Sequence, residues 1–247
     1  MALVGGGGKT STMFQLASEL VRASPKKTRV LTTTSTRIFA AQIRQAPAYV
    51  TFDPEQQTIA NVLTQLDTAV NQHGQVLLIG RADRESGKAF GIPPDIVDEL
   101  AGTNRFDIII NEADGSRMRP LKAPAEHEPV IPTSTTVVVP VAGIDALGRP
   151  LNDETVHRAA LVSRLSGTPL GQRLTVDTIA TVLSHPQGGL ALAQELVERK
   201  KGLRWLEFSN VWVIAYRKAI SAVRQARLSE RSLSSPLSLP CCSLPLL

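Results

Sequence analysis

Aromatic residues, cysteines and long apolar runs are all scarce in this 247-residue sequence. Only 4% of the residues are aromatic, so a core must be built mainly from Val, Ile, Leu and Ala. The two cysteines, Cys241 and Cys242, are adjacent, which excludes the spacing of a zinc site or a disulfide framework. No apolar run approaches the roughly 20 residues of a membrane span, and no basic-then-apolar signal segment opens the chain. We therefore expect a cytoplasmic protein with no membrane partner.

The excess of positive charge is confined to one part of the chain. The formal net charge is +5, and residues 195–231 account for all of it, which leaves residues 1–194 neutral. No basic patch with interleaved aromatic residues, which a nucleic-acid-binding surface would need, occurs in the neutral part. We therefore predict no specific nucleic-acid partner.

A glycine run near the start of the sequence is its most informative motif: Gly5, Gly6, Gly7, Gly8, Lys9, Thr10 and Ser11. Glycines let backbone N–H groups converge on phosphate oxygens, and the helix that follows adds the partial positive charge of its N-terminus. A lysine can neutralise the outer phosphates, and a threonine hydroxyl can ligate Mg²⁺. The pattern is a shortened P-loop, because Leu3 stands where the longer pattern has its first glycine. We predict that these seven residues bind the phosphates of a nucleotide, with a flexible glycine linker as the alternative.

Short apolar strands alternate with helices over the first 141 residues. The helical spacing follows the glycine run and recurs over residues 58–73, and apolar strands are expected at 29–34, 76–79, 107–111 and 136–141. Only residues 2–4 remain for a strand before the glycine loop. This order predicts an α/β fold, with a parallel sheet covered by helices on both faces as in P-loop NTPases. Ligands collect at the carboxyl ends of such strands, where the glycine loop and the residues after Ile110 both fall.

The strand at 107–111 ends in acidic residues, which is what a phosphate loop needs as a second element. Glu112 and Asp114 can hold Mg²⁺ opposite the Thr10 hydroxyl, or position a water molecule. Arg117 follows directly and can neutralise charge during phosphoryl transfer. We therefore assign Thr10, Glu112 and Asp114 to the metal, and Lys9, Asp114 and Arg117 to catalysis. The alternative for the two acids is a solvated turn at a strand end.

Other polar groups are weaker candidates. Arg119 and Lys122 could also face phosphate, and His127 could act as a base or ligand, although an exposed charged loop is the simpler interpretation. Arg81 and Lys88 could reach the same crevice from a neighbouring turn.

The remainder of the chain changes in character. Residues 153–198 are expected to be helical, with breaks at 167–169 and 185–189, and residues 228–247 are rich in Ser, Leu and Pro and are expected to lack packed structure. We predict a P-loop NTPase-like domain over 1–202, followed by a diverged segment and a poorly ordered low-complexity tail over 203–247.

Several blocks together resemble one protein family: GGGGKTS, NEADGSRMRPLKAPAEHEPVIP, GIDALGRPL with the following VHR, and HPQGGL. In this order they resemble the YqeC family, accessory proteins of selenium-dependent molybdenum hydroxylases that are similar to P-loop NTPases. The resemblance implies ATP or GTP with Mg²⁺ as cofactors, and a molybdenum hydroxylase client or molybdopterin cofactor as partner. Two features depart from the family. Gly6 stands where alanine is common, which should loosen the loop, and residues 191–247 lack the base-reading segment.

Three functions follow from these residues. The first is a Mg²⁺-dependent NTPase that assists maturation of a molybdenum hydroxylase or its cofactor. The second is transfer of a phosphoryl or nucleotidyl group to a small acceptor, which the basic loop at 117–122 motivates. The third is a non-catalytic module that binds a client enzyme or its cofactor.

Overall fold

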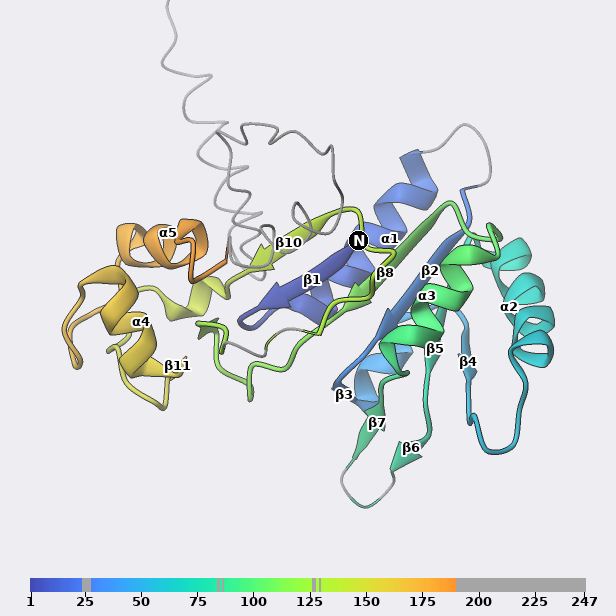
Figure 1. Ribbon diagram of the computed structural model, residues 1–247, viewed down its shortest axis with the longest axis horizontal. Coiled ribbons are helices and arrows are strands. Elements are labelled where there is room, and N and C mark those ends of the chain that lie inside the picture. The colour runs from blue at the N-terminus through green and yellow to red at the C-terminus, as the bar shows by residue number, and fades with distance from the viewer. Residues whose placement is uncertain (24–27, 84, 86, 126–127, 129, 190–247) are drawn as a thin grey trace, which may run out of the picture.

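The computed structural model describes residues 1–23, 28–83, 85, 87–125, 128 and 130–189. Its centre is a sheet in which every neighbouring pair of strands is parallel. The strands lie in the order β10 (Val138–Val141), β1 (Ala2–Gly5), β8 (Ile108–Glu112), β2 (Val30–Thr34), β5 (Gln75–Ile79) and β4 (Tyr49–Thr51) (Figure 1). The strands predicted at 29–34, 76–79, 107–111 and 136–141 are thereby confirmed.

The first strand is short but fully enclosed. β1 pairs with β10 on one side and β8 on the other, and Ala2, Leu3 and Val4 are all buried. Hydrogen bonds extend the pairing beyond the strand, because the Met1 amino group donates to the Ile109 carbonyl at 2.9 Å. β1 therefore holds the start of the glycine loop between β10 and β8.

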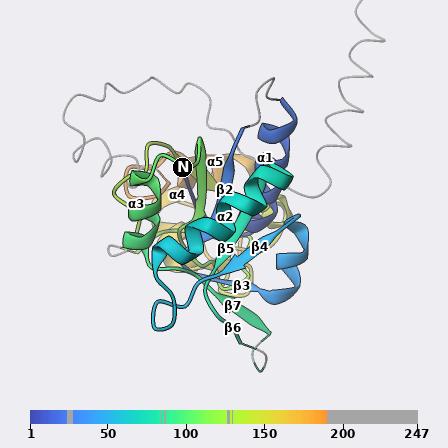
Figure 2. The ribbon, with the colours of Figure 1, turned by 90° about the vertical axis from the view of Figure 1, so that its right-hand side faces the viewer.

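Helices cover both faces of the sheet. Helix α1 (Lys9–Ala23) packs on the face that carries Leu3, Val30 and Ile110. Helices α2 (Ile59–His73) and α3 (Pro94–Gly102) pack on the opposite face, which carries Leu31 among others. Figure 2 shows α1 and α3 on opposite sides of the strands. Because successive strand side chains alternate between faces, neighbours such as Val30 and Leu31 enter different cores.

The ends of α2 follow from its sequence. Thr58 lies just before the helix, and its hydroxyl accepts a hydrogen bond from the Asn61 N–H. Gly74 ends the helix with φ +74°, a left-handed conformation that glycine adopts without a steric penalty. Between these caps the helix buries Val62, Leu66 and Val70, each worth about 1.5–3 kcal/mol on transfer from water.

Two smaller units flank the central sheet. Strands β3 (Arg37–Phe39), β7 (Lys88–Phe90) and β6 (Ala82–Asp83) form an antiparallel sheet. The short 3₁₀ helix η1 (Ala40–Gln45) follows β3 directly and contacts β3 and β7. The pair β9 (Leu121–Lys122) and β11 (Val156–His157) joins the 3₁₀ helix η2 (Ile144–Ala146), α4 (Ala159–Ser166) and α5 (Val176–Ser184) around a separate core. These strands of two or three residues carry no sequence period and were not predicted.

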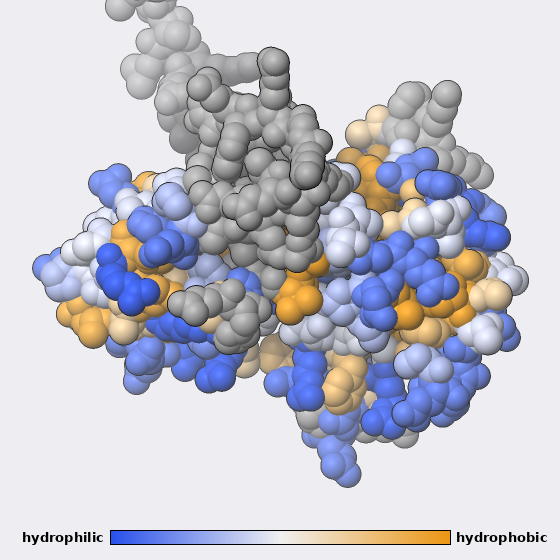
Figure 3. Space-filling view, viewed as in Figure 1, coloured by the Kyte–Doolittle hydropathy of each residue, from blue (hydrophilic) through white to orange (hydrophobic). Residues whose placement is uncertain are grey.

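The expected α/β class, with helices on both faces of a parallel sheet, is confirmed. Helices α4 and α5 confirm helical structure within 153–189, whereas the expectations for 190–198 and for the tail lie outside the described residues. Within the described ranges, none of the helices has both the length and the apolar character needed to cross a bilayer. On the side drawn in Figure 3, hydrophilic residues cover most of the described surface around α2 and the β6–β7 hairpin.

Candidate functional site

The glycine loop joins the carboxyl end of β1 to the first turn of α1. Gly5 and Gly8 have φ values of +104° and +97°, which favour glycine. Gly6 lies against the backbone of the segment 120–121, because a Cβ on Gly6 would lie 2.0 Å from the Pro120 carbonyl oxygen. The Gly6 N–H also donates to the Val141 carbonyl at 2.6 Å, and the Gly7 N–H donates to Pro120 at 3.1 Å. The sequence predicted that Gly6 would loosen the loop, whereas the structure gives it a packing role.

The first turn of α1 leaves a run of donors unused. The backbone N–H groups of Gly8, Lys9, Thr10 and Ser11 donate to no acceptor in the described part of the chain, and the first bond of the helix runs from Thr12 to Gly8 at 2.9 Å. Helix N-termini leave such groups unpaired and carry a partial positive charge. Four successive free N–H groups next to a glycine loop form a site suited to an anion.

Lys9 is folded back over the loop that precedes it. Its amine donates to the carbonyls of Gly5 at 2.7 Å and Gly6 at 2.9 Å. It also lies 3.2 Å from a carboxylate oxygen of Asp114, and only 2% of its side chain is exposed. The lysine charge is therefore held at the loop by internal partners.

Thr10 and Glu112 meet between α1 and the end of β8. The Thr10 hydroxyl donates to Oε2 of Glu112 at 2.7 Å, and both residues are buried. Burial raises the pKa of the Glu112 carboxyl, while the Lys9 charge and the Thr10 hydrogen bond oppose that rise and the Asp114 charge adds to it. The position of the strand end is fixed by the Glu112 carbonyl, which accepts from the Thr34 hydroxyl at 3.1 Å and the Ser35 N–H at 3.0 Å.

Asp114 is the common partner of the loop and of two lysines. Both of its carboxylate oxygens accept from the Gly5 N–H, at 2.9 and 3.0 Å. One oxygen faces Lys9, and the other accepts from the Lys122 amine at 2.8 Å. Only 4% of the Asp114 side chain is exposed. These contacts saturate the carboxylate and make it a positioning residue for the loop and Lys9.

From Asp114 a chain of ion pairs continues through Lys122 to two partly exposed residues, Glu128 and Arg158. The Lys122 side chain is fully buried, and its amine lies 2.8 Å from the Glu128 carboxylate. Arg158 lies 2.9 Å from the same oxygen and also donates to the Ala123 carbonyl at 2.9 Å. Burial acts to raise the pKa of Glu128, but hydrogen bonds and charges from Arg158 and Lys122 outweigh it and lower the pKa to about 2. The pKa of His157 is lowered by burial and by the neighbouring Arg158, Lys122 and Arg117.

Arg117 lies at the rim of this site. It shares a tight turn with Met118, closed by the Arg119 N–H donating to the Ser116 carbonyl at 2.9 Å. Arg117 and Met118 have φ values of +51° and +63°, a conformation that costs a residue other than glycine about 1–3 kcal/mol. Arg117 is exposed, and its guanidinium hydrogen-bonds to none of the described residues. The strained turn holds it next to the glycine loop because the residues that follow contact Gly7.

The structure thus brings together Lys9, Thr10, Glu112 and Asp114 and leaves Arg117 apart from them. From the sequence Lys122 is expected only as a loop residue that could face phosphate, and its pairing with Glu128, which also binds Arg158, is not predicted. The one available signal was a lysine between apolar residues in Pro120-Leu121-Lys122-Ala123. Arg119 turns away, since its Nε donates to the Asp153 carbonyl at 2.7 Å. His127 and Glu126 lie outside the described residues.

Fold and site define a parallel α/β protein with a glycine-rich loop that joins its first strand to its first helix. The family model described as "YqeC protein" matches residues 1–160. The chain is 35% identical over 188 residues to the "Uncharacterized protein YqeC" of Escherichia coli (strain K12), which covers 76% of this chain and 68% of that protein. The chain therefore belongs to the YqeC family. No solved structure matches it.

Proposed function

We propose that the protein binds ATP or GTP with Mg²⁺ at the glycine loop and hydrolyses it as a P-loop-like NTPase. The observation that carries this proposal is the buried hydrogen bond between Thr10 and Glu112 beside four unused N–H groups. A phosphate-binding helix N-terminus and a hydroxyl–carboxylate pair are the two elements that a Mg²⁺–nucleotide complex needs. A bare glycine linker would need neither.

The phosphates would be bound by the N–H groups of residues 8–11 and by Lys9. The lysine amine already lies at the loop, but its donors point to the Gly5 and Gly6 carbonyls. An incoming phosphate would replace one of these two carbonyl oxygens as a partner of the lysine amine. The positive charge of Lys9 would remain paired with Asp114 as well. The contacts of Lys9 with the Gly5 and Gly6 carbonyls and with Asp114 therefore position its amine at the loop and compensate its charge.

Thr10 and Glu112 would bind the metal. Among the described residues no three His, Cys, Asp or Glu side chains gather into a metal site, so the other ligands would be phosphate oxygens and water, as is usual for Mg²⁺. When bound, Mg²⁺ would neutralise charge on the outer phosphates. A cation at this position would also favour the ionised form of Glu112 and so oppose the effect of its burial.

Asp114 and Arg117 would take different parts in the reaction. Asp114 would position Lys9 and the loop, and it could serve the metal or a water only by giving up one of its present partners. Arg117 would swing from the rim to neutralise developing charge on the transferred phosphate. The exposed guanidinium and its strained turn support that role.

The biological setting of the proposal comes from the family resemblance. We propose that nucleotide turnover assists maturation of a selenium-dependent molybdenum hydroxylase or of its molybdopterin cofactor. Co-purification of the protein with such a hydroxylase, compared between wild type and Lys9→Ala, would test the link. Equal recovery of client and equal hydroxylase activity with both would contradict it.

Titration calorimetry with ATP and with GTP, each with and without Mg²⁺, tests the nucleotide site. Lys9→Ala should weaken binding at least about tenfold, since a charged hydrogen bond to phosphate is worth about 1.5–3 kcal/mol. Lys88→Ala is the matched control and should leave affinity unchanged, because Lys88 lies on β7 in the separate β3–β7–β6 sheet, with its amine over the Phe39 ring rather than in the glycine loop as the sequence allowed. Circular dichroism checks that both variants fold. Equal affinities for wild type and Lys9→Ala would rule out the assignment.

A second candidate is a module that binds without turnover. The observation in its favour is the saturation of Lys9 and Asp114 by internal partners, which describes a site that is stable without a nucleotide. Phosphate release by wild type no faster than by Lys9→Ala, together with retained nucleotide affinity, would support this candidate over the NTPase.

A further inference from the structure

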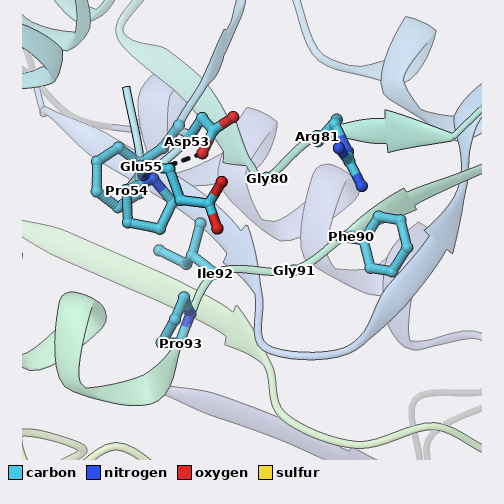
Figure 4. A pocket seen from close by; sticks show the side chains of 10 residues that line it. Asp53, Pro54, Glu55, Gly80, Arg81, Phe90, Gly91, Ile92 and Pro93 are labelled. Carbon is cyan, nitrogen blue, oxygen red and sulfur yellow. Dashed lines mark hydrogen bonds between the residues drawn. The ribbon is translucent and has the colours of Figure 1, made fainter. Parts of the chain in front are cut away.

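A cavity lies at the carboxyl ends of β4 and β5, and its lining includes no residue of the glycine loop. It has a volume of about 280 Å³, and its lining includes Asp53, Glu55, Arg81 and Phe90 around Gly80 and Gly91. Figure 4 shows Asp53 and Glu55 on one side, Arg81 and Phe90 on the other, and the two glycines between them. The cavity is therefore bordered by negative charge on one side and positive charge on the other.

The charges that border the cavity do not neutralise each other. The side chains of Glu55 and Arg81 have no hydrogen bond or ion pair to any described residue. The Asp53 carboxylate accepts one local hydrogen bond from the described residues, from the Glu55 N–H at 3.1 Å, which leaves lone pairs open. The Phe90 ring is held by the Arg37 guanidinium, 4.6 Å from the ring centre. A ligand that fits here needs donors at one end, an anion at the other and a flat apolar body.

The cavity is joined to the nucleotide site through the end of β2. Gly91 packs directly on this segment, since a Cβ there would lie 2.3 Å from the Thr34 carbonyl oxygen, and the Ile92 N–H donates to that oxygen at 2.8 Å. Thr34 in turn donates its hydroxyl to the Glu112 carbonyl at 3.1 Å. The cavity thus lies on the Glu112 side of the loop. Under the proposed function, Glu112 would hold the Mg²⁺ that neutralises charge on the outer phosphates, so the cavity would lie beyond the terminal phosphate.

We propose that this cavity binds a second small molecule of the nucleoside monophosphate class. Its base or ribose donors would face Asp53 and Glu55, its ring would lie against Phe90, and its phosphate would pair with Arg81. The volume lies just below the range of about 300–1,000 Å³ that is typical of small-molecule sites, which favours a small ligand. The position beyond the terminal phosphate, and hence a part in the nucleotide reaction, rests on the proposed function. The binding itself does not.

The test is titration calorimetry of AMP, GMP, CMP and UMP into the full chain without Mg²⁺ or nucleoside triphosphate. We expect at least one to bind, and Arg81→Gln to weaken it at least about tenfold, as expected for loss of a charged hydrogen bond. Glu55→Gln should weaken the same ligand. Arg164→Gln removes an equal charge from an exposed position on α4 and should leave the affinity for the monophosphate unchanged. Inorganic phosphate is titrated in parallel.

The Lys9→Ala variant distinguishes monophosphate binding in the cavity from nucleotide binding at the glycine loop. Binding that is unchanged in Lys9→Ala and weakened in Arg81→Gln supports the second site, even if triphosphates prove not to bind. Binding that is lost in Lys9→Ala and unaffected by Arg81→Gln would mean that the monophosphate occupies the glycine loop, which overturns the proposal. It is also overturned if none of the four monophosphates binds, or if inorganic phosphate alone binds as tightly.

Discussion

The Thr10 hydroxyl and the Glu112 carboxylate are joined by a 2.7 Å hydrogen bond, although 102 residues separate them in sequence. The contact arises because β1 and β8 are adjacent parallel strands, so the segments that follow their carboxyl ends meet at one edge of the sheet. The same adjacency sets the spacing that a cation would bridge. A change at either residue therefore tests both the site and the fold that builds it.

Thr10→Val should remove the part of nucleotide affinity that depends on Mg²⁺. Valine keeps the shape of threonine but has no oxygen for the cation, so we expect affinity with Mg²⁺ to fall about tenfold, toward the value without it. Thr12→Val is the matched control, since the Thr12 hydroxyl is buried on the same helix and has no hydrogen-bond partner among the described residues. Calorimetry with and without Mg²⁺ measures the difference. Equal effects of the two substitutions would exclude a metal role for Thr10.

Glu112→Gln should stabilise the ligand-free protein while it removes Mg²⁺ dependence. The pKa of Glu112 is raised, so folding favours its protonated form, and the ionised group is unfavourable above that raised pKa. Stability linked to this group is thus present below the ordinary pKa of 4.5 and is lost as the pH rises through the folded value. At neutral pH we expect a higher Tm for the glutamine variant by thermal unfolding, and a gap that closes at low pH. A lower Tm at neutral pH would contradict this account.

Lys122→Met should cost far more stability than loss of a surface cation. Lys122 is fully buried between Asp114 and Glu128, and removal of one member of a buried ion pair costs about 3 kcal/mol or more. Arg105→Gln is the comparison, because Arg105 pairs with Asp67 while 48% of its side chain is exposed, and such pairs contribute about 1 kcal/mol or less. Urea unfolding gives both values. Similar losses for the two variants would mean that the buried pairs contribute no more than the surface one.

Gly91→Ala tests the connection between the cavity and β2. A Cβ at position 91 would lie 2.3 Å from the Thr34 carbonyl oxygen and 2.5 Å from that of Thr36, both of them backbone atoms that cannot rotate away. Such overpacking costs about 1–3 kcal/mol of unfolding free energy. Gly102→Ala is the control, because a Cβ there meets nothing within 4 Å. Equal stabilities of the two variants would argue against close packing at Gly91.

The features that could be predicted from sequence are those encoded by a short continuous stretch of residues. The strands around Leu78 and Ile110 contain short apolar runs, the strand around Leu31 is rich in β-branched residues, and the glycine loop is followed at once by a helical period. Parallel order then places Glu112 near Thr10 without further information. Local patterns and parallel strand order together therefore predict the α/β class and the grouping of Lys9, Thr10, Glu112 and Asp114.

The features that could not be predicted depend on contacts between segments that lie far apart in the sequence. Lys122 is buried because β11 pairs with β9 and brings Arg158 toward Glu128. No local sequence pattern predicts that pairing of the two strands. The packing of Gly6 depends on Pro120, more than a hundred residues later. The sheet that carries Phe90 consists of strands too short to show a period. Charge, burial and close approach at these positions are tertiary properties.

Glu128 should give the protein an acid-sensitive component of stability. Its pKa is about 2 in the folded state against an ordinary 4.5, so the stabilisation is complete above 4.5 and is lost as the pH falls toward 2. Urea unfolding of wild type and Glu128→Gln should therefore show wild type as the more stable at pH 6, with a difference that shrinks steadily below pH 4.5. Glu154→Gln is the control, since it removes an equal charge from an exposed residue that forms no ion pair with a described residue, and it should leave the stability at pH 6 close to that of wild type. A constant difference for Glu128→Gln would mean that Lys122 and Arg158 do not stabilise its carboxylate.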